Sequence, residues 1–123
     1  MLGVRVERHA GRIAATVTLG RNGEVATGQV ERPAAEGPRA AAEAAVEALR
    51  QIAPAGTRWA LAHAEVSAVR AGRAVIVQID LETEDGAEHL IGSSLSHSAA
   101  LEEAAARAVV DAVDRRLGWL IRT

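Results

Sequence analysis

A short motif occurs twice in this chain, as AGRIAATVTL over residues 10–19 and as AGRAVIVQIDL over residues 71–81. After the arginine of each copy, apolar residues alternate with other residues, which is the pattern of a β-strand with one buried face. The repeat predicts a chain built from two similar halves. The residues on the predicted buried faces are Ile13, Ala15, Val17 and Leu19 in the first half and Val75, Val77, Ile79 and Leu81 in the second.

The same order of elements surrounds both copies of the motif. Each motif strand leads into a hairpin signal, Asn22-Gly23 in one half and Asp85-Gly86 in the other. These residue pairs tolerate the positive φ angles that a type I′ turn requires. One further strand precedes each Ala-Gly-Arg and another follows each hairpin. The predicted flanking strands are residues 2–8 and 24–31 in the first half and residues 61–70 and 88–96 in the second.

One glycine lies in the middle of the last strand of each half, Gly28 in the first and Gly92 in the second. A glycine inside a strand marks either a bulge or a place where another backbone comes close. Both positions are therefore expected to have a special structural or functional role.

A helical pattern closes each half. The first helix is predicted to begin near Pro38 and to end before Pro54 and Gly56, and the second to run from Ser98 or Ala99 to Leu117. Both present an alanine-rich stripe to the sheet. The stripes are Ala42, Ala45, Val46, Leu49 and Ile52 in the first helix and Leu101, Ala104, Ala105, Ala108, Ala112 and Val113 in the second.

These elements predict an α+β fold of duplicated β-β-β-α units, with two helices on one face of antiparallel sheet. The strands form either one sheet or two abutting sheets. We expect a single domain with approximate two-fold symmetry: repeat one over residues 1–53, a link over 54–60, and repeat two over 61–123. The uncovered sheet face is available to a partner.

Composition excludes several classes of chemistry. The 123 residues include no cysteine and no lysine, and all 14 basic residues are arginines. Disulfides, thiolate nucleophiles, cysteine-bound metals and lysine Schiff bases are therefore excluded. No apolar run approaches the length of a membrane span, and no signal peptide is recognisable, so we expect a cytoplasmic protein without membrane contact.

Catalytic and metal-site patterns are weak. The histidines at positions 9, 63, 89 and 97 do not follow metal-ligand spacings, and the serines at 93, 94, 96 and 98 lack the tight turn of a serine nucleophile. We therefore expect neither an enzyme, nor a metal site, nor a cofactor.

The serine cluster instead suggests a ligand site at the start of the second helix. Hydroxyl groups and free backbone N–H groups at a helix N-terminus can bind a carboxylate or a phosphate, although simple capping of the helix is the alternative. The candidate ligand-binding residues are Gly28, Gly92, Ser93, Ser94, Ser96, His97 and Ser98.

The two tryptophans and an apolar C-terminal segment suggest self-association. The candidate interface residues are Trp59, Trp119, Leu120 and Ile121. Docking of the C-terminal segment on the chain's own core is the alternative.

Charge differs between the halves. Up to Ala60 the net charge is +2, and from Leu61 onward it is −4. Much of the acid lies in the second hairpin, residues 82–88. This hairpin is interpreted as a solvated loop tip, with a contact to a cation or a basic partner as the alternative.

Two families share parts of this pattern. The segment Gly92-Ser93-Ser94, followed by a helix with Glu103-Ala104-Ala105-Ala106-Arg107-Ala108, resembles the end of double-stranded RNA-binding domains. That resemblance implies lysines at the helix start, where this chain has His97-Ser98-Ala99-Ala100, and the missing charge disfavours binding to nucleic acid. The two β-β-β-α units, with Gly28 and Gly92 ahead of their helices, resemble the leucine-sensing regulatory domain of isopropylmalate synthases. This second resemblance implies an effector pocket, often at a dimer interface, although the family's fuller glycine-rich motif is missing.

Together these features predict a non-catalytic module that senses a small ligand or binds protein, and that forms a homodimer. A small anion or an amino acid is the expected ligand class. An RNA-binding domain and an accessory or scaffold subunit of a larger complex are the alternatives.

Overall fold

The computed structural model describes residue 1, residues 3–96 and residues 100–117. The predicted site residues His97 and Ser98, and the predicted interface residues Trp119, Leu120 and Ile121, lie outside this part of the chain. The elements are β1 (Gly3–His9), β2 (Arg12–Arg21), β3 (Glu24–Pro33), a 3-10 turn (Ala34–Glu36), α1 (Gly37–Ile52), β4 (Arg58–Val69), β5 (Gly72–Thr83), β6 (Gly86–Ser96) and α2 (Leu101–Leu117).

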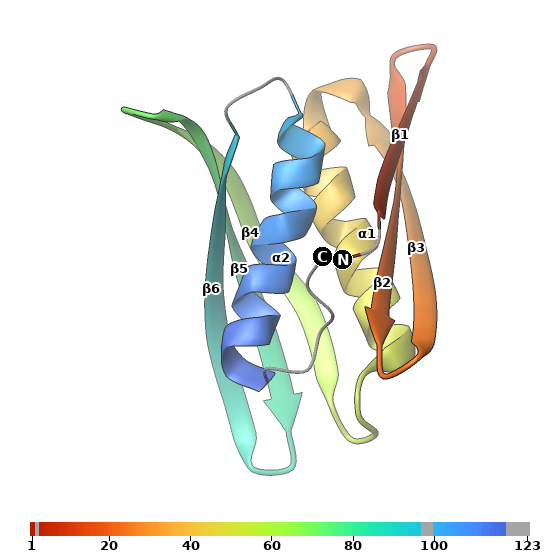
Figure 1. Ribbon diagram of the computed structural model, residues 1–123, viewed down its shortest axis with the longest axis vertical. Coiled ribbons are helices and arrows are strands. Elements are labelled where there is room, and N and C mark those ends of the chain that lie inside the picture. Colours follow the sequence, from red (N-terminus) through yellow and green to blue (C-terminus); the bar gives the residue numbers. More distant parts are fainter. Residues whose placement is uncertain (2, 97–99, 118–123) are drawn as a thin grey trace.

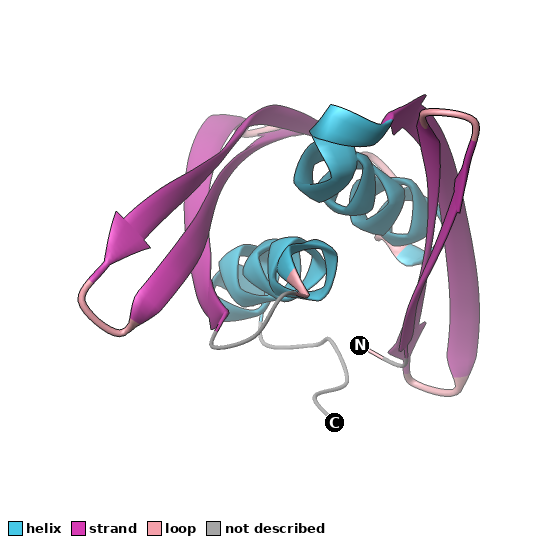
Figure 2. Ribbon diagram, turned by 90° about the horizontal axis from the view of Figure 1, so that it is seen from above, coloured by secondary structure: helices cyan, strands magenta, loops and turns pink. Residues whose placement is uncertain are grey.

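The strands form two antiparallel three-stranded sheets, β1-β2-β3 (sheet A) and β4-β5-β6 (sheet B), each followed by its helix (Figure 1). The predicted α+β fold of duplicated β-β-β-α units is confirmed. The chain forms two sheets, and each helix covers one face of its own sheet. The sheets do not abut as predicted, because the helices lie between them (Figure 2).

The helices lie between the sheets (Figure 2). Helix α1 packs on β2 and β3, α2 packs on β5 and β6, and the two helices pack on each other. Buried side chains from both halves therefore form one continuous core. Its bulk comes from residues such as Ile13, Leu19, Leu49 and Ile79, while fully buried alanines line both helices. The layers are sheet A, α1, α2 and sheet B, and small side chains let them approach closely. Close packing of this kind fills the core although the chain contains two aromatic residues.

The two mid-strand glycines are the points of closest approach between sheet and helix. A Cβ atom at Gly28 would lie 2.1 Å from the carbonyl oxygen of Ala44, and one at Gly92 would lie 2.1 Å from that of Ala108. Strand pairing runs without a register shift through both positions. The predicted close approach is confirmed, and the alternative of a bulge is wrong at both sites. Sheet B does contain a register shift, between Leu61 and His63.

The hairpin turns differ between the halves. In sheet A the turn residues are Ala10-Gly11 and Asn22-Gly23, all with positive φ, as a type I′ turn requires. In sheet B the turn residues are Arg70-Ala71 and Glu84-Asp85. The glycines come one residue later, as the first residues of the following strands. Gly72 has a φ of 137° and Gly86 a φ of 125°. The prediction that Asp85-Gly86 forms the turn itself is therefore one residue out of place.

Several predicted boundaries also shift. Strand β4 begins at Arg58, inside the predicted link, so the connection between the halves is residues 53–57. Helix α1 begins at Gly37, one residue before Pro38, and ends before Pro54 as predicted. Of the helices that the structure describes, none has the length and apolar character needed to cross a membrane.

Candidate functional site

The structure separates Gly28 from the other predicted ligand-binding residues. Gly28 lies on sheet A, whereas Gly92, Ser93, Ser94 and Ser96 follow one another on β6 of sheet B. Gly28 and Gly92 are both buried against their helices. Packing thus accounts for the two glycines, and each faces a helix rather than a shared site.

The serines of β6 point to alternate sides of sheet B. Ser96 is buried on the helix side, and Ser93 is exposed on the other. The backbone N–H of Ser93 donates a hydrogen bond to Oδ2 of Asp111 in α2, at 3.2 Å. This bond satisfies a donor on the strand at the edge of the sheet. The predicted anion site at the start of α2 stays a prediction, since part of it lies outside the described residues.

The predicted interface residue Trp59 is 3% exposed and belongs to the core. Its indole N–H donates to Oγ1 of Thr57 at 3.0 Å, and that hydroxyl donates to the carbonyl of Pro54 at 2.6 Å. The carbonyl of Trp59 accepts a hydrogen bond from Nε of Arg50, in the last turn of α1, at 2.9 Å. These bonds fix the connection between the halves against the end of α1.

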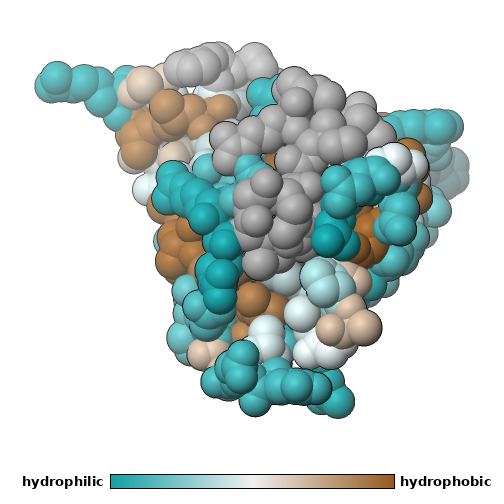
Figure 3. Space-filling model, turned by 60° about the horizontal axis from the view of Figure 1, so that its bottom comes forward, coloured by the Kyte–Doolittle hydropathy of each residue, from teal (hydrophilic) through white to brown (hydrophobic). Residues whose placement is uncertain are grey.

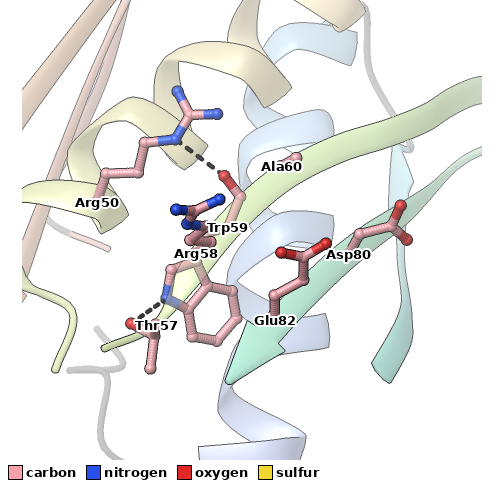
Figure 4. Close-up of a pocket in the computed structure, with 7 residues that line it drawn as sticks. All are labelled: Arg50, Thr57, Arg58, Trp59, Ala60, Asp80 and Glu82. Carbon is pink, nitrogen blue, oxygen red and sulfur yellow. Dashed lines mark hydrogen bonds between the residues drawn. The ribbon is translucent and has the colours of Figure 1, made fainter. Parts of the chain in front are cut away.

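A cavity of about 580 Å³ opens beside this tryptophan (Figure 4). Three separate segments build it: the end of α1, the connection with the start of β4, and the second half of β5. Arg58 and Glu82 are partners in the β4–β5 register, and so are Ala60 and Asp80. The lining residues are Arg50, Thr57, Arg58, Trp59, Ala60, Asp80 and Glu82.

The cavity carries both signs of charge. Arg50 and Arg58 supply guanidinium groups, and Asp80 and Glu82 supply carboxylates. Arg50 also pairs with Glu47, one helical turn earlier. Within the described chain, the side chains of Arg58 and Glu82 form no ion pair with each other or with a third residue. Both charges therefore remain available to a bound molecule.

Asp80 is held in its ionised form. Nδ1 of His89 donates to Oδ1 of Asp80 at 2.7 Å, and Nε2 of Gln78 donates to the same oxygen at 3.3 Å. The hydrogen bond from His89, followed by that from Gln78, lowers the pKa of Asp80 below its ordinary value. Asp80 is consequently a carboxylate at neutral pH.

A smaller groove of about 180 Å³ shares Arg50 and Ala60 with the cavity and extends along α1. Its far end is closed by Glu43, which pairs with Arg32 of β3 at 2.7 Å and with Arg39 at 2.8 Å. These charges are neutralised within the chain, unlike those of Arg58 and Glu82. No three His, Asp or Glu side chains among the described residues are grouped as a metal site.

The sequence does not predict this cavity. It marks Glu82 only as part of the acidic hairpin, and Arg50, Thr57 and Arg58 belong to no motif. A weak signal is present, because two arginines flank the connection that Pro54 and Gly56 mark.

In comparisons with known proteins, no protein-family model matches the chain, and no curated protein sequence matches it.

Proposed function

We propose that this protein is a non-catalytic small-ligand-binding module and that its site is the cavity beside Trp59. The volume of about 580 Å³ lies within the usual range of ligand pockets, roughly 300–1,000 Å³. Such pockets combine an apolar wall with a few fixed polar groups, and here Trp59 and Ala60 supply the apolar part.

The charged side chains of the cavity favour a ligand that carries one negative and one positive group. A guanidinium group binds a carboxylate with two parallel hydrogen bonds, so Arg58 is the proposed partner of a ligand carboxylate. Asp80 and Glu82 are the proposed acceptors for an ammonium group. An amino acid or a similar small zwitterion meets both requirements. The observation that carries the proposal is the unpaired state of Arg58 and Glu82, although their strand positions are opposite each other.

The proposal is tested by thermal melting and calorimetric titration of the full chain. The probes are the twenty standard amino acids and a series of short mono- and dicarboxylates, each at millimolar concentration. At least one amino acid is expected to raise the melting temperature. Arg58→Gln is expected to weaken its binding by about 10- to 100-fold, because it removes the positive charge and the paired hydrogen bonds of the guanidinium, and a hydrogen bond to a charged group contributes about 1.5–3 kcal/mol.

Two further variants sharpen this test. Ala60→Leu keeps every charge but narrows the cavity at its apolar wall, so it should weaken binding. Arg5→Gln removes an exposed arginine from sheet A and should bind as the parent does. The proposal fails if no probe raises the melting temperature, or if Arg58→Gln and Ala60→Leu bind with unchanged affinity.

A further inference from the structure

Sheet A serves as an internal comparison for the cavity, because the mid-strand glycines and their register partners align the two halves residue by residue. In this alignment Asp80 and His89 of sheet B correspond to Gly20 and Val25 of sheet A. Both pairs are cross-strand partners in their own sheets. The halves are alike where they face the helices, and they differ on their outer faces. The β-β-β-α fold therefore forms without the hydrogen-bonded Asp80–His89 pair, and the fold does not explain why sheet B has it.

The charges of the cavity do not cancel. Arg50 pairs with Glu47, one turn earlier on its own helix, so its charge is already matched. Of the remaining lining residues, Arg58 supplies one positive charge, and Asp80 and Glu82 supply two negative charges. With histidine neutral, these side chains carry one negative charge in excess. A ligand that matches them carries one more positive group than a simple zwitterion does.

The arginines of the β4–β5 hairpin are too far away to balance this excess. The hairpin projects from the body at the other end of sheet B (Figure 1), and Figure 3 shows its surface as hydrophilic. From Arg73 to Asp80 the strand advances about 23 Å, at about 3.3 Å per residue. This distance exceeds two Debye lengths at physiological ionic strength, about 16 Å. Glu84 and Asp85, in the nearer β5–β6 turn, add negative charge instead.

The two carboxylates follow one another along β5 and are placed differently relative to Arg58 (Figure 4). Glu82 is the register partner of Arg58 on the neighbouring strand, and paired strands lie about 4.8 Å apart. The carboxylate and the ammonium group of an amino acid are bonded to the same carbon atom, so they suit this adjacent pair. Asp80 lies two residues farther along the strand, on the same face of the sheet, which is about 6.6 Å from Glu82.

Asp80 suits a second cation at the end of a ligand side chain. Three or four methylene groups carry a terminal nitrogen about 5–6 Å from the α-carbon, because each C–C bond of about 1.5 Å advances an extended chain by about 1.3 Å. Ala60, the register partner of Asp80, is small and leaves room for the methylene groups. Hydrogen bonds from His89 and Gln78 hold Oδ1 of Asp80, so the carboxylate is fixed at the place where such a side chain ends.

We propose that the cavity selects basic amino acids, with Arg58 binding the α-carboxylate, Glu82 the α-ammonium group and Asp80 the cation at the end of the side chain. The ligand class is an amino acid whose side chain of three or four methylene groups ends in an ammonium or guanidinium group, as in ornithine, lysine and arginine. Asp80 is the specificity-determining residue. This inference rests on the proposed function, since it names the ligand class of the same cavity.

The test is calorimetric titration of the full chain with matched pairs of amino acids. Lysine is compared with norleucine, and ornithine with norvaline, because the members of each pair differ only in the terminal ammonium group. Titrations are run at about pH 8, above the usual titration range of histidine side chains. The parent should bind the basic member of each pair at least about tenfold more tightly, which is the contribution of a charge-assisted hydrogen bond.

Three variants separate the roles of the carboxylates. Asp80→Asn should remove the preference for basic amino acids and leave the affinity for norleucine unchanged. Glu82→Gln should weaken the binding of lysine and of norleucine by the same factor, about tenfold or more, because both carry the α-ammonium group. Asp85→Asn is the matched control, since it makes the same chemical change in the β5–β6 turn, outside the cavity. The far-ultraviolet circular dichroism of every variant should match that of the parent.

The outcomes distinguish this inference from the proposed function. If norleucine and norvaline bind as tightly as lysine and ornithine, or if Asp80→Asn keeps the preference of the parent, the selection of basic amino acids is overturned while the ligand-binding module stands. The same conclusion follows if Asp85→Asn abolishes the preference, because the general charge of the hairpin would then produce it. If no amino acid binds, both proposals fail.

Discussion

Two glycines determine how closely each helix of this protein lies on its sheet. At Gly28 the neighbouring helix atoms are backbone atoms of Ala44 and Ala48, and at Gly92 they are the equivalent atoms of Ala108 and Ala112. A backbone atom cannot rotate away as a side chain can. Any side chain at either glycine therefore has to push the whole helix outward.

We expect Gly28→Ala and Gly92→Ala each to lower the free energy of unfolding by about 1–3 kcal/mol or more, the cost of overpacking a rigid contact. Gly3→Ala is the control, since a Cβ atom there meets nothing within 4 Å. Urea denaturation measures all three. Unchanged stability in both core variants would contradict the close contact.

The sequence predicts a special role for these glycines because glycine weakens the interior of a strand, and it is used there where a bulge or a close approach requires it. It does not show that the contact is with the chain's own helices rather than with a ligand. That distinction depends on the distance between layers, which no local pattern encodes.

At the scale of elements, an ion pair between Arg8 and Glu102 links the two halves of the protein. Arg8 of β1 pairs with Glu102 in the first turn of α2, and this carboxylate also lies against Gly37, the first residue of α1. Glu102 is 7% exposed, whereas Arg8 is largely exposed. The buried carboxylate therefore depends on a partner that reaches it from the surface.

Arg8→Ala is expected to lower the free energy of unfolding by about 1–3 kcal/mol, because it leaves a buried carboxylate without its charged partner. Arg5→Ala, which breaks the exposed pair with Glu7, should change the free energy of unfolding by less than about 0.5 kcal/mol. Chemical denaturation of both variants at pH 7 provides the comparison. Equal effects would show that burial of Glu102 contributes nothing.

Strands and helices are predictable here because their signals are local. Alternation identifies β2 and β5, and Pro38 and Pro54 bracket α1. The turns of sheet B are displaced by one residue because Gly72 and Gly86 follow their turns instead of forming them. A dipeptide such as Asp85-Gly86 can place its glycine inside the turn or directly after it. Which of the two occurs depends on how the flanking strands pair.

For the whole molecule, the shared core predicts that both halves unfold together. Leu49 of α1 and Ile79 of β5 belong to the same buried cluster and are fully buried. Leu49→Ala and Ile79→Ala should each cost about 2–5 kcal/mol and shift one common transition. Tryptophan fluorescence and circular dichroism should report the same midpoint, with exposed Val25→Ala as the control. Separate transitions for the two halves would contradict a common core.

The cavity beside Trp59 could not be predicted from the sequence. Its walls come from Arg50, from residues 57–60 and from Asp80 and Glu82, which are brought together only when α1 and sheet B pack at the connection between the halves. The sequence likewise leaves the number of sheets open, since three strands and a helix per half satisfy the same pattern in one sheet or in two.

The difference between the two outer faces follows from joining the repeats in one chain. Two separate copies of a single β-β-β-α unit would build the same interior, but every substitution would then appear on both outer faces at once. In the joined chain, a mutation changes one face and leaves the other as it was. Ile91 and Leu95 are exposed on the outer face of sheet B, where the aligned positions of sheet A are Thr27 and Glu31. Two identical separate units could not acquire this difference.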